Sequence, residues 1–275
     1  MAKTKRMIQS HMALVDIVIE LLDARIPLSS RNMDIGKLAG GKERIVILNK
    51  SDLADPGATK QWEAFFLREG AKTYALNARD KNAALKITGI ARELMKEKTE
   101  RRKNRGIINS NIRAMVAGIP NVGKSTFINS LYGRAGADTA DRPGVTRGRQ
   151  WIKLSGGLDL LDTPGILWPK FEDENVGIKL AVTGAVADSI LDRVTLCEHL
   201  LAMLSEINPS SYIKRYKLNE NIGPEANPRE LLEIIGNARG FKLKGGVIDI
   251  ERAAVIVLDE FRAGKLGRIT LELPV

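Results

Sequence analysis

The chain has 275 residues, 44% hydrophobic and 28% charged, which is enough for one large core or for a large and a smaller one. Its single cysteine, Cys197, excludes an intramolecular disulfide and is expected to be a core thiol. No uncharged apolar run reaches membrane-spanning length, so we expect a cytoplasmic protein without a membrane partner. The net charge of +10 favours polyanionic partners, nucleic acid first; the alternative is a merely soluble basic protein.

Strands and helices are predicted to alternate through the first part of the chain. The predicted strands cover residues 13–22, 44–48, 72–76, 112–117 and 158–162. The predicted helices cover residues 31–40, 59–69 and 83–98, and the basic residues 98–105 are expected to form an exposed connector. Such alternation predicts an α/β fold with a mostly parallel sheet flanked by helices.

A phosphate-binding motif follows the strand predicted at residues 112–117. Residues 118–125 read Gly-Ile-Pro-Asn-Val-Gly-Lys-Ser and match G-x-x-x-x-G-K-[ST] between a strand and a helix. Lys124 is expected to reach the β- and γ-phosphates and Ser125 to bind Mg²⁺; a plain glycine-rich turn, the alternative, would not need this pair. The residues of this P-loop expected to contact nucleotide are Asn121, Val122, Gly123, Lys124, Ser125 and Thr126.

A second motif, Asn49-Lys50-Ser51-Asp52, ends another apolar strand and selects the base. The Asp52 carboxylate can accept hydrogen bonds from the ring N–H and the exocyclic amine of guanine, whereas adenine has an acceptor at that ring position. A buried site built for such paired bonds rejects a base that lacks them on the order of 10⁴-fold. Asn49 can bond the purine N7 and brace the loop, and the Lys50 stem can lie over the base. The motif therefore predicts GTP rather than ATP.

A third motif, Asp162-Thr163-Pro164-Gly165, ends the strand predicted at residues 158–162. Asp162 can hold the Mg²⁺ shell, and the Gly165 N–H can meet the γ-phosphate. Thr146 lies in a Gly/Pro-rich stretch before this motif and can close over Mg²⁺ when the γ-phosphate is present; the alternative is an ordinary loop threonine. Lys124, Thr146 and Gly165 are thus the residues expected to serve hydrolysis.

The order of these motifs resembles that of a circularly permuted GTPase, because Asn49–Asp52 and then Asn77-Ala78-Arg79 precede the P-loop. Over nearly its whole length the chain resembles the YlqF/RbgA group of ribosome-biogenesis GTPases. The stretches that carry this resemblance are residues 23–27, 29–32, 118–125, 141–146, 162–171, 245–246 and 264–268.

The resemblance implies a circularly permuted P-loop GTPase domain over residues 1–172 and a helical domain that binds RNA and the ribosome over residues 173–275. It implies an Mg²⁺-dependent GTPase, stimulated by the ribosomal subunit, that binds the large subunit and its rRNA in late bacterial assembly, with no DNA partner. It also places Asn77 and Ala78 where backbone groups support the guanine; the alternative is a polar loop after a short strand.

Three features bear on hydrolysis. Ile166 stands where many GTPases carry a water-orienting glutamine, which excludes glutamine-based catalysis there. The family is thought to use a histidine just before a Met-Ala-Lys segment, and this sequence begins at that segment. The catalytic histidine is therefore absent from it, through a shortened sequence, a misassigned start codon or true loss; His11 and His199 are interpreted as ordinary histidines. Asn121 resembles the P-loop asparagine of potassium-stimulated GTPases, which implies K⁺ as a further cofactor, or else braces the loop.

The last hundred residues show only helical apolar spacing, at residues 176–186, 195–206, 228–239 and 250–263. Basic residues near the turns are interpreted as rRNA phosphate contacts: Lys214, Arg215, Lys217, Lys242, Lys244, Lys265 and Arg268. Because the loop after Gly165 leads within a few residues into these helices, γ-phosphate binding is expected to reorient them. The alternative function is a GTP-dependent RNA-binding switch or chaperone with negligible hydrolysis.

Overall fold

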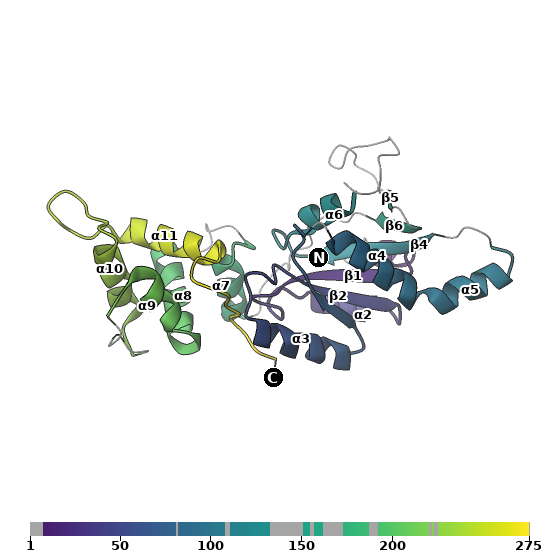
Figure 1. Ribbon diagram of the computed structural model, residues 1–275, viewed down its shortest axis with the longest axis horizontal. Helices are drawn as coiled ribbons and strands as arrows, with labels where there is room; N and C mark the ends of the chain where they lie inside the picture. Colours follow the sequence, from purple (N-terminus) through teal and green to yellow (C-terminus); the bar gives the residue numbers. More distant parts are fainter. Residues whose placement is uncertain are drawn as a thin grey trace.

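The protein is described by a computed structural model that covers residues 8–80, 82–107, 111–132, 151–154, 157–161, 173–186, 192–219, 222 and 225–274. Its strands are β1 (Ile17–Asp23), β2 (Glu43–Asn49), β3 (Lys72–Ala75), β4 (Ile112–Gly118), β5 (Trp151–Leu154) and β6 (Leu158–Leu161). They form one sheet in the order β3-β2-β1-β4-β6-β5 (Figure 1). Neighbouring strands are parallel, except that β5 runs antiparallel to β6.

The register brings the ends of three central strands to one edge of the sheet. Asp23 at the end of β1 lies opposite Asn49 at the end of β2, and Leu21 lies opposite Gly118 at the end of β4. All seven residues of β1 are buried, as expected for the middle of a parallel sheet covered on both faces. The loops that follow these strands are therefore neighbours in space.

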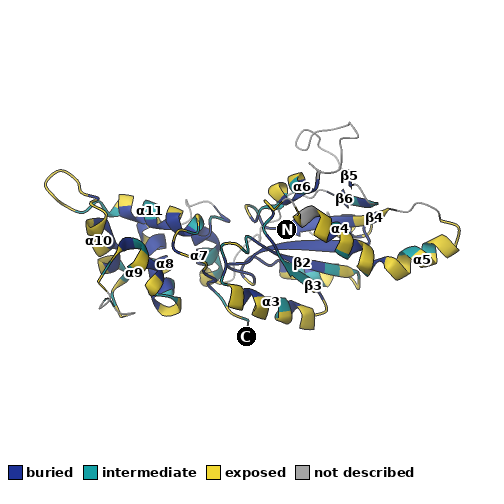
Figure 2. Cartoon of the chain, viewed as in Figure 1, coloured by how far each residue is buried: buried dark blue, intermediate teal, exposed yellow. Residues whose placement is uncertain are grey.

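Helices cover both faces of the sheet. They are α2 (Met33–Leu38), α3 (Pro56–Arg68), α4 (Ala83–Leu94), α5 (Lys96–Asn104) and α6 (Lys124–Tyr132). Alternate residues of β1 point to opposite faces: Ile19 packs in the cluster that contains α4 and α6, while Val18 and Leu22 pack in the clusters that contain α2 and α3. Figure 2 shows this arrangement as buried strands between helices whose outer surfaces are exposed.

A helical region follows the sheet in the chain. Its elements are α7 (Glu174–Val182), α8 (Arg193–Ile207), α9 (Ser210–Tyr216), α10 (Pro228–Ala238) and α11 (Ile250–Arg262). Helix α8 contacts α7, α10 and α11, and the apolar core of this region is continuous with the core under one face of the sheet. Cys197 on α8 is fully buried, and burial raises its thiol pKa, which confirms the prediction of a core thiol.

The predicted fold class is confirmed: a mostly parallel α/β sheet followed by a helical region. The details differ where the apolar signal is weak. The helix predicted over residues 83–98 breaks at Met95. The basic connector is itself helical, as α5, and its sequence has no apolar period because none of its residues is buried in a core. The sequence also missed the four-residue edge strand β5 and the helix α9. The domain boundary expected at residues 172–173 adjoins residues outside the described part, and it stays a prediction.

Candidate functional site

The P-loop leaves β4 at Gly118 and enters α6 at Lys124. It turns tightly, because both Asn121 (φ 55°) and Gly123 (φ 99°) adopt left-handed backbone conformations. At Gly123 any Cβ would overlap the side-chain amide of Asn49, so only glycine fits there. The loop borders a cavity of about 460 Å³ together with Lys124, Ser125 and Thr126, which is the space that the sequence assigned to phosphates.

Asn49 joins this loop to the two base-binding loops. Its Nδ2 donates to the Val122 carbonyl oxygen at 2.7 Å, and its Oδ1 accepts from the Ala78 backbone N–H at 2.8 Å. Asn49 is buried, so both bonds are shielded from water. The expected bracing role of Asn49 is thus visible as hydrogen bonds, while its contact with the purine N7 stays a prediction.

A second cavity, of about 570 Å³, adjoins the first. The motif residues that line it are Asn49, Lys50, Asp52, Asn77, Ala78, Asn121, Gly123 and Thr126. Asn121, Gly123 and Thr126 border both cavities, so the space assigned to the base is continuous with the space assigned to the phosphates. Asp52 is exposed, and within the described residues its carboxylate makes no hydrogen bond or ion pair. It is available to a ligand.

A buried ionic cluster underlies this cavity. Asp23 accepts from Arg25 Nε (3.0 Å) and Nη2 (2.8 Å) and from the Lys50 ammonium (2.9 Å). Burial opposes ionisation of Asp23, but the charges of Arg25 and Lys50 outweigh it and hold the Asp23 pKa well below its usual range. The ion pair with Asp23 fixes the Lys50 side chain, and the backbone of Lys50 adopts a left-handed conformation (φ 58°).

Arg25 also connects the cluster to the helical region. Its Nη2 donates to the Thr183 carbonyl oxygen at 3.2 Å, and its guanidinium carbon lies 5.6 Å from the centroid of the Phe261 ring. Its Nη1 is buried and has no hydrogen-bond partner among the described residues, although Arg25 lines the second cavity.

Residues from the helical region form part of the cavity wall. Thr183, Arg262 and Ala263 line it together with the motif residues, and Arg262 donates to the carbonyl oxygens of Ala181 (2.8 Å) and Val182 (3.1 Å). Sequence reasoning missed these residues. Arg25 was noted only within the family resemblance, and nothing in the sequence relates residues 262 and 263 to a loop more than 200 residues away.

Three predicted site residues, Thr146, Asp162 and Gly165, lie outside the described residues. Among the described residues no group of three or more His, Cys, Asp or Glu side chains could hold a metal. The exposed Ser125 hydroxyl suits Mg²⁺, which protein sites typically hold through one or two side chains plus phosphates and water. No helix in the described part of the chain combines the length and apolar character of a membrane span.

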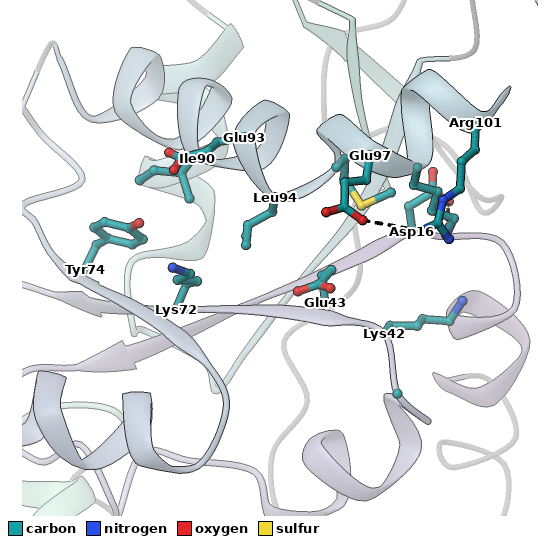
Figure 3. A pocket seen from close by; sticks show the side chains of 13 residues that line it. Asp16, Lys42, Glu43, Lys72, Tyr74, Ile90, Glu93, Leu94, Glu97 and Arg101 are labelled. Carbon is teal, nitrogen blue, oxygen red and sulfur yellow. Dashed lines mark hydrogen bonds and ion pairs between the residues drawn. The ribbon is translucent and has the colours of Figure 1, made fainter. Parts of the chain in front are cut away.

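A further cavity, of about 680 Å³, is drawn in Figure 3 and lies at the opposite edge of the sheet, where β1, β2 and β3 begin. Glu43 and Lys72, which line it, are the first residues of β2 and β3, and Asp16 directly precedes β1. Ligands of open α/β sheets bind at the carboxyl ends of the strands. The lining mixes acidic and basic side chains, among them Glu93, Glu97 and Arg101, and carries none of the motif residues.

A phosphate loop and a guanine-selecting loop therefore meet at the carboxyl edge of the sheet, with the base loop first along the chain. This arrangement defines a P-loop GTP-binding protein with circularly permuted motifs.

Comparison with known proteins agrees. Residues 113–224 match the family described as 50S ribosome-binding GTPase. Ribosome biogenesis GTPase A of Bacillus cereus is 46% identical over 274 residues, which cover 100% of this chain and 92% of the relative. The Thermotoga maritima protein of the same name is 32% identical over 99% of this chain and 91% of its own. The GNP-bound crystal structure of YlqF from T. maritima superposes with a TM-score of 0.64 at 29% identity, covering 99% of this chain and 98% of that one. The chain belongs to the ribosome biogenesis GTPase A (YlqF/RbgA) family.

Proposed function

We propose that this protein hydrolyses GTP with Mg²⁺ and acts in the cytoplasm in late assembly of the large ribosomal subunit, where it binds rRNA. The observation that carries this proposal is the pair of continuous cavities in a chain of this family. They are lined by the P-loop and by Asp52, whose carboxylate makes no hydrogen bond or ion pair among the described residues. The names of the matched family and of the B. cereus relative support the ribosomal partner.

The described residues suit successive parts of a bound nucleotide. Asp52 would accept from guanine, with the Lys50 stem over the base and the loop at Asn77 and Ala78 beneath it. Lys124 would neutralise the β- and γ-phosphates, and the backbone N–H groups of the P-loop would cradle them. Ser125 would hold Mg²⁺, which neutralises charge that develops on the phosphates. Asp162, Thr146 and Gly165 would complete the metal and γ-phosphate contacts; K⁺ at Asn121 would be a second cation.

The rRNA-binding face is proposed to lie on the helical region, away from the sheet. Exposed basic residues gather at the end of α9 and on the loop between α10 and α11, namely Lys214, Lys217, Lys242 and Lys244. That loop projects from the region (Figure 1) and is closed by a hydrogen bond from the Leu243 N–H to the Val247 carbonyl oxygen at 2.8 Å. Arg215 and Arg268 were expected in this set but are engaged internally, Arg215 with Glu260 and Arg268 with backbone carbonyls of the base loop.

Co-sedimentation with large ribosomal subunits tests the partner. Wild-type protein with a non-hydrolysable GTP analogue is expected to pellet with large subunits, and the double variant Lys242→Ala/Lys244→Ala to bind about tenfold more weakly at low salt, because phosphate contacts are lost. The double variant Lys37→Ala/Lys60→Ala removes two exposed lysines of α2 and α3 and should bind normally. No pelleting of the wild type would contradict the proposal.

Phosphate release tests hydrolysis. A time course with and without large subunits is expected to show Mg²⁺-dependent release that the subunits accelerate. Replacing Na⁺ by K⁺ should accelerate it further if Asn121 holds a cation. Release no faster than uncatalysed GTP hydrolysis under all conditions would favour the alternative, a GTP-dependent RNA-binding switch or chaperone.

A further inference from the structure

The base loop is held by residues from the other end of the chain. The C-terminal segment, residues 265–274, runs from α11 back to the sheet and α3 (Figure 1). Arg268 donates from Nε to the Ala54 carbonyl oxygen and from Nη2 to the Ser51 carbonyl oxygen, both at 2.9 Å. The Ile269 N–H donates to the Leu53 carbonyl oxygen at 3.0 Å. The backbone on both sides of Asp52 is thereby fixed from outside the motif.

Thr270 extends this grip to the start of α3. Its Oγ1 accepts from the Asp55 N–H at 3.1 Å, and Asp55 in turn caps α3 by accepting from the Ala58 N–H at 2.7 Å. Residues 51–55 of the loop between β2 and α3 are therefore hydrogen-bonded to the C-terminal segment at four of their five positions. The exception is Asp52, which lines the cavity.

The C-terminal segment is itself firmly seated. Ile269 and Leu271 are buried, and the Leu271 N–H donates to the Arg25 carbonyl oxygen at 2.8 Å. Glu272 contributes at both its ends: its backbone carbonyl accepts from Trp62 Nε1 at 3.0 Å, and its carboxylate accepts from the Ser29 hydroxyl at 2.8 Å. A segment anchored in this way can hold a loop in one position rather than merely cover it.

The turn between α11 and the C-terminal segment closes against the same loop. Gly264 has a left-handed backbone (φ 74°), and a Cβ there would come within 2.6 Å of the Leu53 side chain. The adjoining Ala263 lines the cavity. The turn after α11 therefore packs against the Leu53 side chain of the base loop, and Ala263 forms part of the wall of the cavity that this loop borders.

We propose that the C-terminal segment is a positioning element for guanine recognition and that Arg268 is its main positioning residue. By holding the carbonyls on both sides of Asp52, Arg268 keeps the carboxylate aimed at the base. Loosening the segment lowers the affinity for GDP and for GTP to the same extent, because both nucleotides carry the same base. This differs from γ-phosphate coupling, which distinguishes the two nucleotides. The proposal rests on guanine binding alone and not on the proposed ribosomal function.

Base discrimination provides the test. Asp52 can accept two hydrogen bonds from guanine but only one from hypoxanthine, which lacks the exocyclic amine. For Arg268→Ala we expect Kd for fluorescent GDP to rise about tenfold and Kd for IDP, measured by competition, to rise only about threefold, because two bonds are weakened in the first case and one in the second. The preference for GDP over IDP should therefore fall. Arg268→Lys, which can still reach one carbonyl, should recover part of it.

Two controls separate positioning from a general loss of structure. Leu273→Ala alters an exposed side chain of the same segment, and Arg229→Ala removes a half-exposed arginine of α10; neither should change GDP affinity. Thr270→Val removes the acceptor of the Asp55 N–H with little change in shape and should also lower the preference for GDP. Unchanged GDP affinity in Arg268→Ala, or equal weakening of GDP and IDP in both Arg268→Ala and Thr270→Val, would overturn the proposal.

Discussion

The Asp23, Arg25 and Lys50 side chains combine a structural and a functional task. A buried carboxylate is tolerated only when paired, and here two cations pair with it while one of them, Lys50, belongs to the base loop. The geometry of the base loop thus depends on a charge at the end of a different strand. Sequence analysis saw Asp23 and Arg25 only as part of a family resemblance and gave them no role.

Replacement of Asp23 by asparagine should be strongly destabilising. Asp23→Asn leaves Arg25 buried without its counter-charge, and we expect a loss of about 3 kcal/mol in the free energy of unfolding by urea. Glu206→Gln, which changes an exposed carboxylate of α8, should stay within about 0.5 kcal/mol of the wild type.

The stability difference between wild type and Asp23→Asn should also depend on pH. Because the folded-state pKa of Asp23 lies below that of the unfolded chain, the ionised group stabilises the fold above the unfolded pKa of about 3.9, and this contribution disappears as pH falls toward the folded-state value. The stability difference between wild type and Asp23→Asn should be constant near neutrality and narrow below about pH 4. A difference that widens on acidification would contradict the assignment.

Helix α5 shows how an element without a core can be held. It buries none of its residues, yet Asp16 accepts from Arg102 at 2.7 Å and pairs with Lys98 at 3.1 Å. Burial of Asp16 opposes its ionisation, but hydrogen bonds from Arg102, the Arg113 N–H and Lys98 hold its pKa below the ordinary value. Asp16 thus holds the helix beside the cavity of Figure 3.

Neutralising Asp16 should release α5. In Asp16→Asn we expect trypsin to cut within residues 96–105 about tenfold faster, which corresponds to about 1.4 kcal/mol less resistance to local opening. Glu97→Gln breaks only the exposed pair with Arg101 and serves as the control. Equal cleavage rates in Asp16→Asn and wild type would show that α5 is held by other contacts.

At the scale of elements, the sequence predicted what is locally encoded. The P-loop and the Asn49–Asp52 loop were found because each motif lies within a few residues of an apolar strand. Helix α5 was expected only as an exposed connector, since its charged sequence has no apolar face, and β5 was missed because four residues at a sheet edge carry almost no periodicity. The contacts of Arg25, Arg262 and Arg268 could not be predicted, because they join segments far apart in the chain and need the folded geometry.

At the scale of the whole molecule, the guanine loop, the sheet and the helical region form one connected unit. The Leu53 and Arg25 carbonyls receive hydrogen bonds from the C-terminal segment, and Asn49 carries the connection to the P-loop. Binding of GDP, which has no γ-phosphate, should therefore already stabilise the C-terminal segment.

Hydrogen exchange can measure this connection. With GDP at about 100 times its Kd, exchange of the Ile269 and Leu271 amides should slow by up to about a hundredfold, because opening that releases GDP becomes about 2.7 kcal/mol more costly. Amides of α10, in the part of the helical region that carries the projecting loop, should change little. Protection confined to the P-loop and residues 49–55 would show that the segment moves independently of the site.

The hydrogen bonds from residues 268–271 to the loop after Asn49 also have a consequence for the order in which the chain is completed during translation. The base loop and the P-loop leave the ribosome early, but the residues that hold the base loop follow more than 200 positions after it. A nascent chain must be translated past Leu271 before these hydrogen bonds to the base loop can form. Contacts of such sequence separation also carry a loop-closure entropy cost that slows folding. If the C-terminal segment positions the base loop as we propose, a growing chain is expected to bind guanine nucleotides tightly and selectively only after nearly all of the helical region has formed.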